Sequence, residues 1–266
     1  MIDNPRSPRV RAVAKLAKRE ARSETGLFLL EGPQAVAEAL AFRPELVVDL
    51  FATPTAWEKH SGLASAASAA DLEVEFVTEA VLDAMADTVT PQGIVAVCRQ
   101  FLRSVDDILA AGPRLIAILE EVRDPGNAGT IIRVADAAGA DAVILTGSSV
   151  DVYNPKVVRS TTGSLFHLPV ASGAELESVV DRVKAAGMQV IAADIKGGDL
   201  LAARNSGALA GPTAWLFGNE ARGLTDEHYA LADWVISVPI YGHAESMNLA
   251  TAASVCLYES AFAHRS

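Results

Sequence analysis

The sequence has few cysteines and no long apolar run, and both absences narrow the class of protein. Only two cysteines occur among its 266 residues, Cys98 and Cys256, and both stand in apolar segments. They are expected to be small buried hydrophobic residues rather than a disulfide or a metal pair. No apolar stretch approaches the roughly 20 residues that cross a bilayer, so no membrane partner is expected. The basic N-terminus has neither the apolar core nor the cleavage site of a secretory signal, which predicts a cytoplasmic protein.

Motifs that define several common ligand sites are also missing. Neither a G-x-G-x-x-G fingerprint nor a G-x-x-x-x-G-K-[ST] phosphate loop occurs, so standard dinucleotide and nucleoside-triphosphate sites are not expected. The five histidines and two cysteines have no metal-ligand spacing, so no bound metal is expected.

Positive charge is scarce overall but concentrated at one end of the chain. The formal net charge is −11, yet residues 1–22 hold seven Lys and Arg against two acidic residues, which leaves the other 244 residues at −16. Phosphate binding depends on Lys and Arg, so this end is where a nucleic acid is expected to bind. The alternative is an ordinary solvated helix face. The residues predicted to bind the nucleic acid are Arg9, Arg11, Lys15, Lys18 and Arg22.

Strand and helix signals alternate along the chain, which predicts an α/β protein of two domains. Residues 8–23 have amphipathic helical spacing with Val10, Val13 and Leu16 on the inner face. Residues 101–113 are polar at first and end in Gly112-Pro113, as in a linker, so the predicted domains are 1–105 and 106–266. In the first domain strands are predicted at 26–32, 45–52, 72–78 and 93–100, with a helix at 57–70. In the second, strands are predicted at 115–119, 142–145, 167–170, 188–193, 214–217 and 234–238, in the alternation typical of a parallel sheet.

Three strands of the second domain end in turns rich in Gly, Asn and acidic residues. The first turn, 124–127, leads into a helix predicted over 128–138 with Gly139 at its C-cap. The second, 218–223, contains glycines that let the backbone approach a ligand closely. The third follows Pro239 and leads, through the cap-type residues Ser246 and Asn248, into a long C-terminal helix. These turns predict a binding site at one corner of the domain.

Together these segments resemble the motifs of the SpoU, or TrmH, family of RNA ribose 2′-O-methyltransferases, within the SPOUT superfamily. The matching pieces are PGNAGTIIRVADAAGAD, LFGNEARGL and VPIYGHAESMNLATAASVCLYE, in the family's order across residues 114–259. The N-terminal third is similar to the family's substrate-binding domain through RVRAVAKLAKREARSETGLFLLEGPQAVAEAL and TPQGIVAV. The resemblance implies a C-terminal SPOUT domain with a parallel sheet and a deep trefoil knot, preceded by a small ribosomal-protein-like α/β domain that binds RNA.

The resemblance also implies S-adenosyl-L-methionine as cofactor and assigns residues to the site. Met247 stands where most members have leucine, a change that conserves volume. The implied cofactor-binding residues are Gly218, Val238, Ile240, Met247 and Asn248, and the implied catalytic residues are Arg133, Asn127, Glu220, Ser246 and Asn248.

Arg133 has two possible roles in such an enzyme and one structural alternative. It could act as the base or orient the ribose or its phosphate. An arginine side chain is a poor base at neutral pH, so the orienting role is physically easier. If it were only structural, a carboxylate such as Asp136 or Glu120 would pair with it. His243, in the third turn, is expected at the surface or against RNA rather than as a base.

The implied partners are RNA, most specifically ribosomal RNA, and a second copy of the chain. The small apolar face of Ala250, Ala253, Leu257 and Ala261 is the predicted surface of a homodimer. The alternatives are a transfer-RNA ribose methyltransferase, a non-catalytic RNA-binding module, and an α/β enzyme with another nucleotide cofactor. Intact motifs around Arg133 and the third turn favour the enzyme over the module, and the missing phosphate-loop glycines disfavour the third class.

Overall fold

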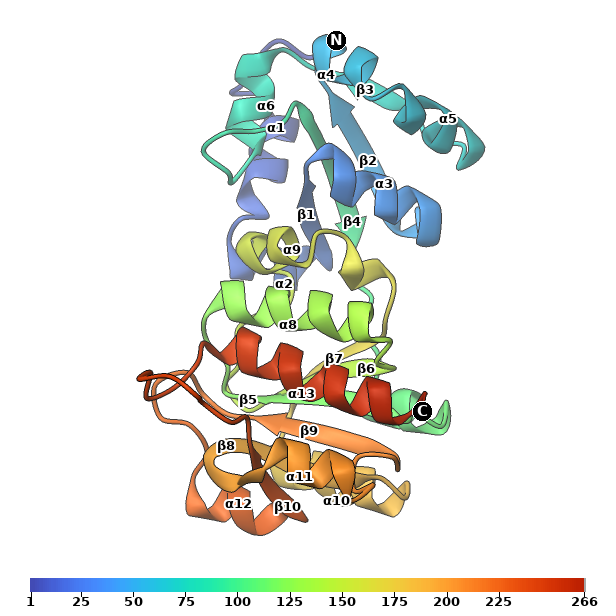
Figure 1. Ribbon diagram of the computed structural model, residues 1–266. Coiled ribbons are helices and arrows are strands. Elements are labelled where there is room, and N and C mark those ends of the chain that lie inside the picture. The colour runs from blue at the N-terminus through green and yellow to red at the C-terminus, as the bar shows by residue number, and fades with distance from the viewer. Residues whose placement is uncertain (266) are drawn as a thin grey trace. The chain divides into compact units, whose positions relative to one another are not determined.

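The computed structural model describes residues 1–265, and its contacts divide the chain into two compact units (Figure 1). Unit 1 comprises Met1–Phe101 and Asp151–His167, and unit 2 comprises the rest. Residues 151–167 thus pack with the N-terminal part of the sequence although they lie within its second half. Helices and strands alternate in both units, so the predicted α/β class is confirmed. None of the helices described is long and apolar enough to cross a membrane.

Unit 1 is built on a four-stranded mixed sheet in the order β1-β4-β2-β3. Both β1 and β2 run antiparallel to β4, whereas β3 runs parallel to β2. The four strands lie where the sequence predicts them, at Leu27–Glu31, Val47–Ala52, Val74–Phe76 and Ile94–Arg99. The helix predicted at 57–70 is two helices, because His60 has a non-helical backbone. The other elements are α3 (Pro33–Phe42), η1 (Pro44–Leu46), α4 (Pro54–Lys59), α5 (Ser61–Ala69), α6 (Glu79–Met85), α9 (Pro155–Thr161) and η2 (Ser164–Phe166).

The amphipathic N-terminal segment forms two short helices, α1 (Pro8–Lys15) and α2 (Arg19–Thr25), rather than one. The residue before α2 is extended, so the helix predicted over 8–23 is interrupted there. Val10, Val13 and Leu16 are buried in the core of unit 1, together with side chains of β1, β2, β4 and α6. The predicted apolar face is therefore confirmed.

Unit 2 is built on a six-stranded sheet in the order β10-β8-β9-β5-β6-β7, and every neighbouring pair is parallel. The predicted parallel sheet is confirmed. One strand begins later than the predicted 167–170, because the chain first makes the 3-10 turn η2. The strands are β5 (Leu115–Glu120), β6 (Ala142–Thr146), β7 (Val170–Ala174), β8 (Gln189–Asp199), β9 (Thr213–Phe217) and β10 (Trp234–Ser237).

Helices cover both faces of this sheet, which explains why its central strands β5 and β9 are buried along their whole length and are mostly apolar. On one face α8 (Pro125–Ala138) and α13 (Leu249–Ala263) lie side by side (Figure 1). The buried indole N–H of Trp215 in β9 donates a 2.9 Å hydrogen bond to Ser260 of α13. On the other face α7 (Val105–Ala110) and α10 (Leu176–Ala185) pack on alternate residues of the strands. Two short helices, α11 (Leu200–Asn205) and α12 (Asp226–Leu231), complete the unit.

The small apolar face of α13 is buried inside the chain. Ala250, Ala253, Leu257 and Ala261 are at most 4% exposed, because α13 packs on α8, β5 and β9. The prediction that this face receives a second subunit is therefore wrong. The solvent side of α13 carries instead Tyr258 and Phe262, whose ring centroids lie 5.6 Å apart.

The two cysteines are free and fully buried, Cys98 in unit 1 and Cys256 in unit 2. Burial raises the pKa of both thiols far above the usual value, so they remain protonated and unreactive. Their predicted role as small hydrophobic residues is confirmed.

Candidate active site

The three turns singled out in the sequence leave the carboxyl ends of β5, β9 and β10, on the same side of the sheet. In the strand order of the sheet, β6 and β7 lie on one side of β5, and β9, β8 and β10 lie on the other. In open α/β sheets ligands bind outside the carboxyl ends of strands at such a change of direction. A cavity of about 530 Å³ lies there, within the size range of small-molecule sites.

All the residues predicted to hold the cofactor line this cavity, and so do most of the predicted catalytic residues. From the catalytic set Asn127, Glu220, Ser246 and Asn248 are present. The remaining lining residues predicted from the sequence are Gly218, Val238, Ile240 and Met247. The structure therefore brings together three segments, although the residue from the first segment, Asn127, is 93 residues from Glu220 and 121 residues from Asn248 in the sequence. Arg133 is the one predicted catalytic residue that does not line the cavity.

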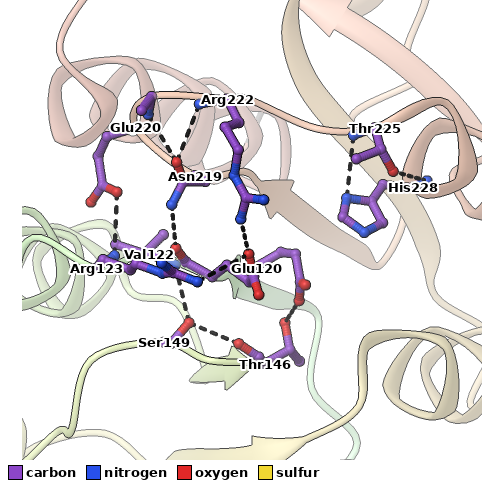
Figure 2. Close-up of polar contacts among 12 residues, drawn as sticks. Glu120, Val122, Arg123, Thr146, Ser149, Asn219, Glu220, Arg222, Thr225 and His228 are labelled. Atoms are coloured by element: carbon purple, nitrogen blue, oxygen red, sulfur yellow. Dashed lines mark hydrogen bonds and ion pairs between the residues drawn. The ribbon is translucent and has the colours of Figure 1, made fainter.

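Glu220 joins the first turn to the second. Its carboxylate accepts hydrogen bonds from the backbone N–H groups of Arg123 (3.2 Å) and Asp124 (3.1 Å) and from the side-chain amide of Asn127 (3.3 Å). Figure 2 shows the carboxylate directed at the backbone of Arg123. Charge-assisted bonds of this kind are the stronger ones, so Glu220 fixes the shape of the turn before α8.

Asn248 joins the third turn to the same network. Its side-chain amide donates a 3.0 Å hydrogen bond to Oδ1 of Asn127. Its own Oδ1 accepts from the backbone N–H groups of Ala250 and Thr251, so Asn248 is the N-cap of α13, as predicted. Ser246 lies two residues earlier and does not cap the helix, although it lines the cavity.

The turn after β5 contains a residue in an unusual backbone conformation. Glu121 has φ of 49°, in the left-handed region that costs a non-glycine residue about 1–3 kcal/mol. Its carbonyl accepts a 2.7 Å hydrogen bond from the Asn219 amide, and its carboxylate pairs with Arg222. The second turn thus stabilises the first. Glu121, Asn219 and Arg222 were not predicted as site residues. The adjacent carboxylates Glu120 and Glu121 at the end of a buried strand were the sequence feature that could have indicated this contact.

Gly218 and Gly223 make the second turn tight. A Cβ on Gly218 would lie 2.6 Å from the carbonyl carbon of Gly223, and Gly223 has φ of 65°. The space beside Gly218 is thus filled by its own turn. Gly218 shapes the wall of the cavity because no larger residue allows this approach.

A fourth segment, which was not predicted from the sequence, completes the wall. β8 pairs with β10 at Ala192 and next at Gly198, so residues 193–197 bulge out of the ladder. A Cβ on Gly197 would lie 2.5 Å from the backbone nitrogen of Ile236, so glycine is needed there. The bulge brings Asp194 and Lys196 to the cavity. Adjacent glycines inside a strand pattern are the signal that marks such a bulge.

Tyr229 of α12 stands beside this fourth segment. Burial, together with the hydrogen bond and the charge of Asp194, raises the pKa of Tyr229 to about 12. The Lys196 ammonium lies 5.7 Å from the centroid of the tyrosine ring. This end of the cavity therefore offers a carboxylate, a neutral phenol and a cation, which suit a ligand with hydroxyl and charged groups.

Arg133 lies outside the cavity. It stands six residues beyond Asn127 on α8, about 9 Å along the helix axis and about 240° around it. Its side chain is exposed and makes no hydrogen bond or ion pair with any residue in the range 1–265. Neither Asp136 nor Glu120 pairs with it, so the structural alternative considered for this arginine is not observed.

The N-terminal residues predicted to bind RNA fall into three groups: exposed and unpaired, exposed but ion-paired, and buried. Arg11, Lys15 and Lys18 are exposed, and their side chains have no hydrogen-bond or ion-pair partner among the described residues. Arg19 is exposed and unpaired within the same part of the chain, although it was not predicted. Arg9 is half exposed but forms ion pairs at 2.8 Å with both Asp49 and Glu75.

Arg22 does not fit its predicted RNA-binding role, because it is only 2% exposed. Its guanidinium donates to Asp151 at 2.6 and 3.0 Å, and to the carbonyls of Leu16 (2.8 Å) and Ala17 (2.9 Å). These bonds fasten the connection between α1 and α2 to residue 151, all within unit 1. A phosphate cannot reach this side chain in the folded protein.

Two further features bear on the chemistry. Over residues 1–265 no group of three or more His, Cys, Asp or Glu side chains is arranged to hold a metal ion. His243 is exposed in the third turn and does not line the cavity.

Comparison with known proteins identifies the class. The model of the SpoU rRNA Methylase family matches residues 114–258, and the model of the MRM3-like substrate binding domain matches residues 7–96. By class the protein is an RNA 2′-O-methyltransferase of the SPOUT superfamily. The chain belongs to the SpoU, or TrmH, family, as its motifs predict.

Relatives match the chain over nearly its whole length. The 23S rRNA (guanosine(2553)-2′-O)-methyltransferase RlmP of Bacillus subtilis (strain 168) is 34% identical over 97% of each chain. The AdoMet-bound rRNA methyltransferase from Sinorhizobium meliloti has a similar structure, with 32% identity, a TM-score of 0.84, and coverage of 97% of this chain and 96% of that one. The SpoU methyltransferase AviRb from Streptomyces viridochromogenes, in complex with the cofactor AdoMet, has 30% identity, a TM-score of 0.83, and coverage of 96% and 98%.

Proposed function

We propose that this chain transfers the methyl group of S-adenosyl-L-methionine to a ribose 2′-hydroxyl in 23S ribosomal RNA. The observation that carries the proposal is the cavity whose walls are joined by the hydrogen bonds of Glu220, Asn127 and Asn248. The relative from B. subtilis is named for 23S rRNA, and two similar structures hold AdoMet. Such a substrate implies a cytoplasmic protein.

The residues around the cavity fit this cofactor. Val238, Ile240 and Met247 provide an apolar wall suited to an adenine ring, while Asp194 and Lys196 provide charges for the hydroxyl and amino-acid groups. When bound, S-adenosyl-L-methionine supplies the methyl group. We also infer that the segment carrying the second and third turns forms the deep trefoil knot implied by the family motifs.

The chain's own residues position the ribose and hold the turns. An in-line displacement needs two ligands held in line and one proton removed. Glu220 holds Asn127 and the turn before α8, and Asn248 holds Asn127 from the other side. The Ser246 hydroxyl lines the cavity and has no hydrogen-bond partner within residues 1–265, so it is available to the incoming nucleotide.

The role proposed for Arg133 is to orient the ribose or its phosphate, and a homodimer accounts for its position. Within one chain this arginine is exposed and lies off the cavity, so it would act in the site of the partner subunit. The exposed Tyr258 and Phe262 on the neighbouring helix α13 supply apolar surface for such a contact. Light scattering should give twice the chain mass of 27.8 kDa, and a monomer at micromolar concentration contradicts the dimer.

The boundary near residue 105 remains our proposal for the limits of the substrate-binding and catalytic domains. The two family models match on either side of it, ending at residue 96 and beginning at residue 114. The free cations of α1 and the following residues support RNA binding by the N-terminal part.

The test is methylation of total cellular RNA with labelled cofactor, followed by mapping of the modified nucleotide. The expected product is one 2′-O-methylated nucleotide in 23S rRNA. Label confined to transfer RNA would assign a different substrate. RNA binding without any label would identify a non-catalytic module.

A further inference from the structure

Unit 1 contains a cavity of its own, which no part of the proposed reaction uses. It lies between the beginning of α3, the loop of residues 86–93 and the end of α9, and its volume is about 250 Å³. This is smaller than the roughly 300–1,000 Å³ of a site for a whole cofactor and far larger than the site of one water molecule. The size suits a single flat group.

The charges at this cavity favour a neutral occupant. The Arg159 guanidinium is 2.6 Å from the Glu31 carboxylate and 2.9 Å from Asp87. Glu31, whose side chain is only 5% exposed, also accepts the backbone N–H groups of Asp87 and Thr88, each at 3.1 Å. One cation therefore faces two carboxylates and is fully used by them. A phosphate or another anion would be repelled.

Uncharged polar groups remain available around the cavity. The Gln92 amide and the hydroxyls of Thr88, Thr90 and Thr162 make no hydrogen bond with the part of the chain that the structure describes. An amide offers both a donor and an acceptor, which is the pattern that the edge of a nucleobase requires. Apolar contact comes from Ala35, Pro91 and Ile94.

The rim of the cavity contains a strained residue. Thr162 has φ of 52°, an outlier for a β-branched side chain. The next residue, Gly163, packs so closely on α3 that a Cβ there would lie 2.4 Å from Cγ of Glu38. Left-handed conformations at non-glycine positions persist where the surrounding structure imposes them, and they cluster at ligand sites.

The same unit also carries exposed cations that could hold phosphates, and α6 connects them to the loop that lines the cavity. The loop 86–93 directly follows α6, and α6 packs against α1. The exposed side of α1 carries the free cations Arg11 and Lys15. RNA-binding proteins commonly read single-stranded segments by splaying bases into pockets while basic side chains hold the backbone.

We propose that this cavity binds one unstacked base of the RNA substrate, a base other than that of the methylated nucleotide. The proposal rests on the proposed function and adds a second point of RNA recognition. It makes the polar groups around Gln92 a determinant of which RNA segment is bound.

The experiment compares two tryptophan variants of the same loop in the full-length protein. Thr90→Trp fills the cavity, because Thr90 lines it. Val89→Trp adds the same bulk next to it, on a side chain that is 99% exposed and does not line the cavity. Affinity for purified 23S rRNA is measured without cofactor, and cofactor affinity is measured by calorimetry as a check on folding. Thr90→Trp should raise the Kd for RNA about 10-fold, the order of one base contact, while Val89→Trp should not.

A second measurement identifies the base. In a 23S rRNA transcript that contains the mapped nucleotide, single abasic positions are scanned against the parent protein and Thr90→Trp. One position should weaken parent binding about 10-fold and leave the binding of Thr90→Trp unchanged. Equal effects of the two tryptophan variants, or additive effects at every abasic position, overturn the proposal. If the variants and the abasic scan give the expected RNA-binding results but the protein methylates no RNA, the proposed function is wrong and the base-binding cavity stands.

Discussion

The side-chain amide of Asn248 donates a 3.0 Å hydrogen bond to Oδ1 of Asn127 and so joins the beginning of α13 to the beginning of α8. The oxygen of the same Asn248 side chain caps α13 through Ala250 and Thr251. One side chain therefore serves helix stability with its oxygen and the proposed site with its nitrogen. Substitutions that remove only one of these groups separate the two contributions.

Asn248→Asp should reduce turnover at least 10-fold while largely preserving stability. Aspartate still caps α13 with an oxygen, but it has no N–H for Asn127 and adds negative charge near Glu220. Asn248→Ala removes the cap as well, and should lower the free energy of unfolding by about 1 kcal/mol. Urea unfolding and initial rates of RNA methylation measure the two effects. Parent-like turnover in Asn248→Asp would contradict a role for this hydrogen bond.

Ala252→Leu should weaken cofactor binding at least 10-fold without unfolding the chain. Ala252 lines the cavity from the first turn of α13, and leucine is a good helix former that fills the space with a larger side chain. Thr251→Leu is the matched control, since Thr251 is the exposed neighbour on the same helix. Calorimetry with S-adenosyl-L-methionine should show unchanged affinity in the control. Unchanged affinity in both variants would place the cofactor elsewhere.

Replacing Arg11, Lys15, Lys18 and Arg19 with Gln should weaken RNA binding and flatten its salt dependence. Each of these exposed side chains that contacts a phosphate contributes about 0.7–0.9 to the slope of log K against log salt. Cofactor affinity should be unchanged, because the cofactor site proposed here lies in unit 2. If the variant had the parent's RNA affinity at every salt concentration, these side chains would be exposed to solvent without contacting the RNA.

Within the same unit, Arg22→Gln gives the contrasting result expected of a buried residue. It should destabilise the protein by about 3–5 kcal/mol, because the buried guanidinium of Arg22 is the partner of Asp151 and of two carbonyls. Thermal unfolding measures this loss.

Asp233 should make stability depend on pH in the acid range. Partial burial raises its pKa, but the hydrogen bond from Lys184 and the backbone N–H of Val190 outweigh this and leave the pKa below the usual 3.8. Because the folded-state pKa is lowered, the carboxylate stabilises the fold above about pH 4, and this contribution is lost as the pH falls through the folded pKa. Asp233→Asn should therefore be less stable than the parent at pH 7 and closer to it at pH 3. An equal difference in the free energy of unfolding at both pH values would contradict this assignment.

The parts of the site that depend on local pattern could be predicted from the sequence. The capping residues, the turns after β5, β9 and β10 and the family motifs together placed Asn127, Glu220 and Asn248 in one cavity. Contacts between distant residues were not visible in the same way. The periodicity around Arg22 is that of a basic helix, and only the folded chain shows Asp151, 129 residues away, beside its guanidinium.

Two other features could not be read from periodicity for the same reason. An apolar helix face can pack on a partner subunit or on the sheet of its own chain, and periodicity does not distinguish the two. The face of α13 was therefore wrongly predicted to contact a partner subunit. The bulge at 193–197 depends on the close approach of Gly197 to Ile236, a contact that strand composition does not encode. The cavity residues Asp194 and Lys196 were missed with it.

The most direct test of the account uses a 23S rRNA transcript with a single 2′-deoxy substitution at the mapped nucleotide. The parent transcript should accept labelled methyl groups from S-adenosyl-L-methionine, and the substituted transcript should accept none, because the proposed acceptor is the 2′-hydroxyl that it lacks. A control transcript with the 2′-deoxy substitution one nucleotide away should be methylated like the parent. Label incorporated at the 2′-deoxy nucleotide would show that the chain methylates a base, and would contradict ribose 2′-O-methylation.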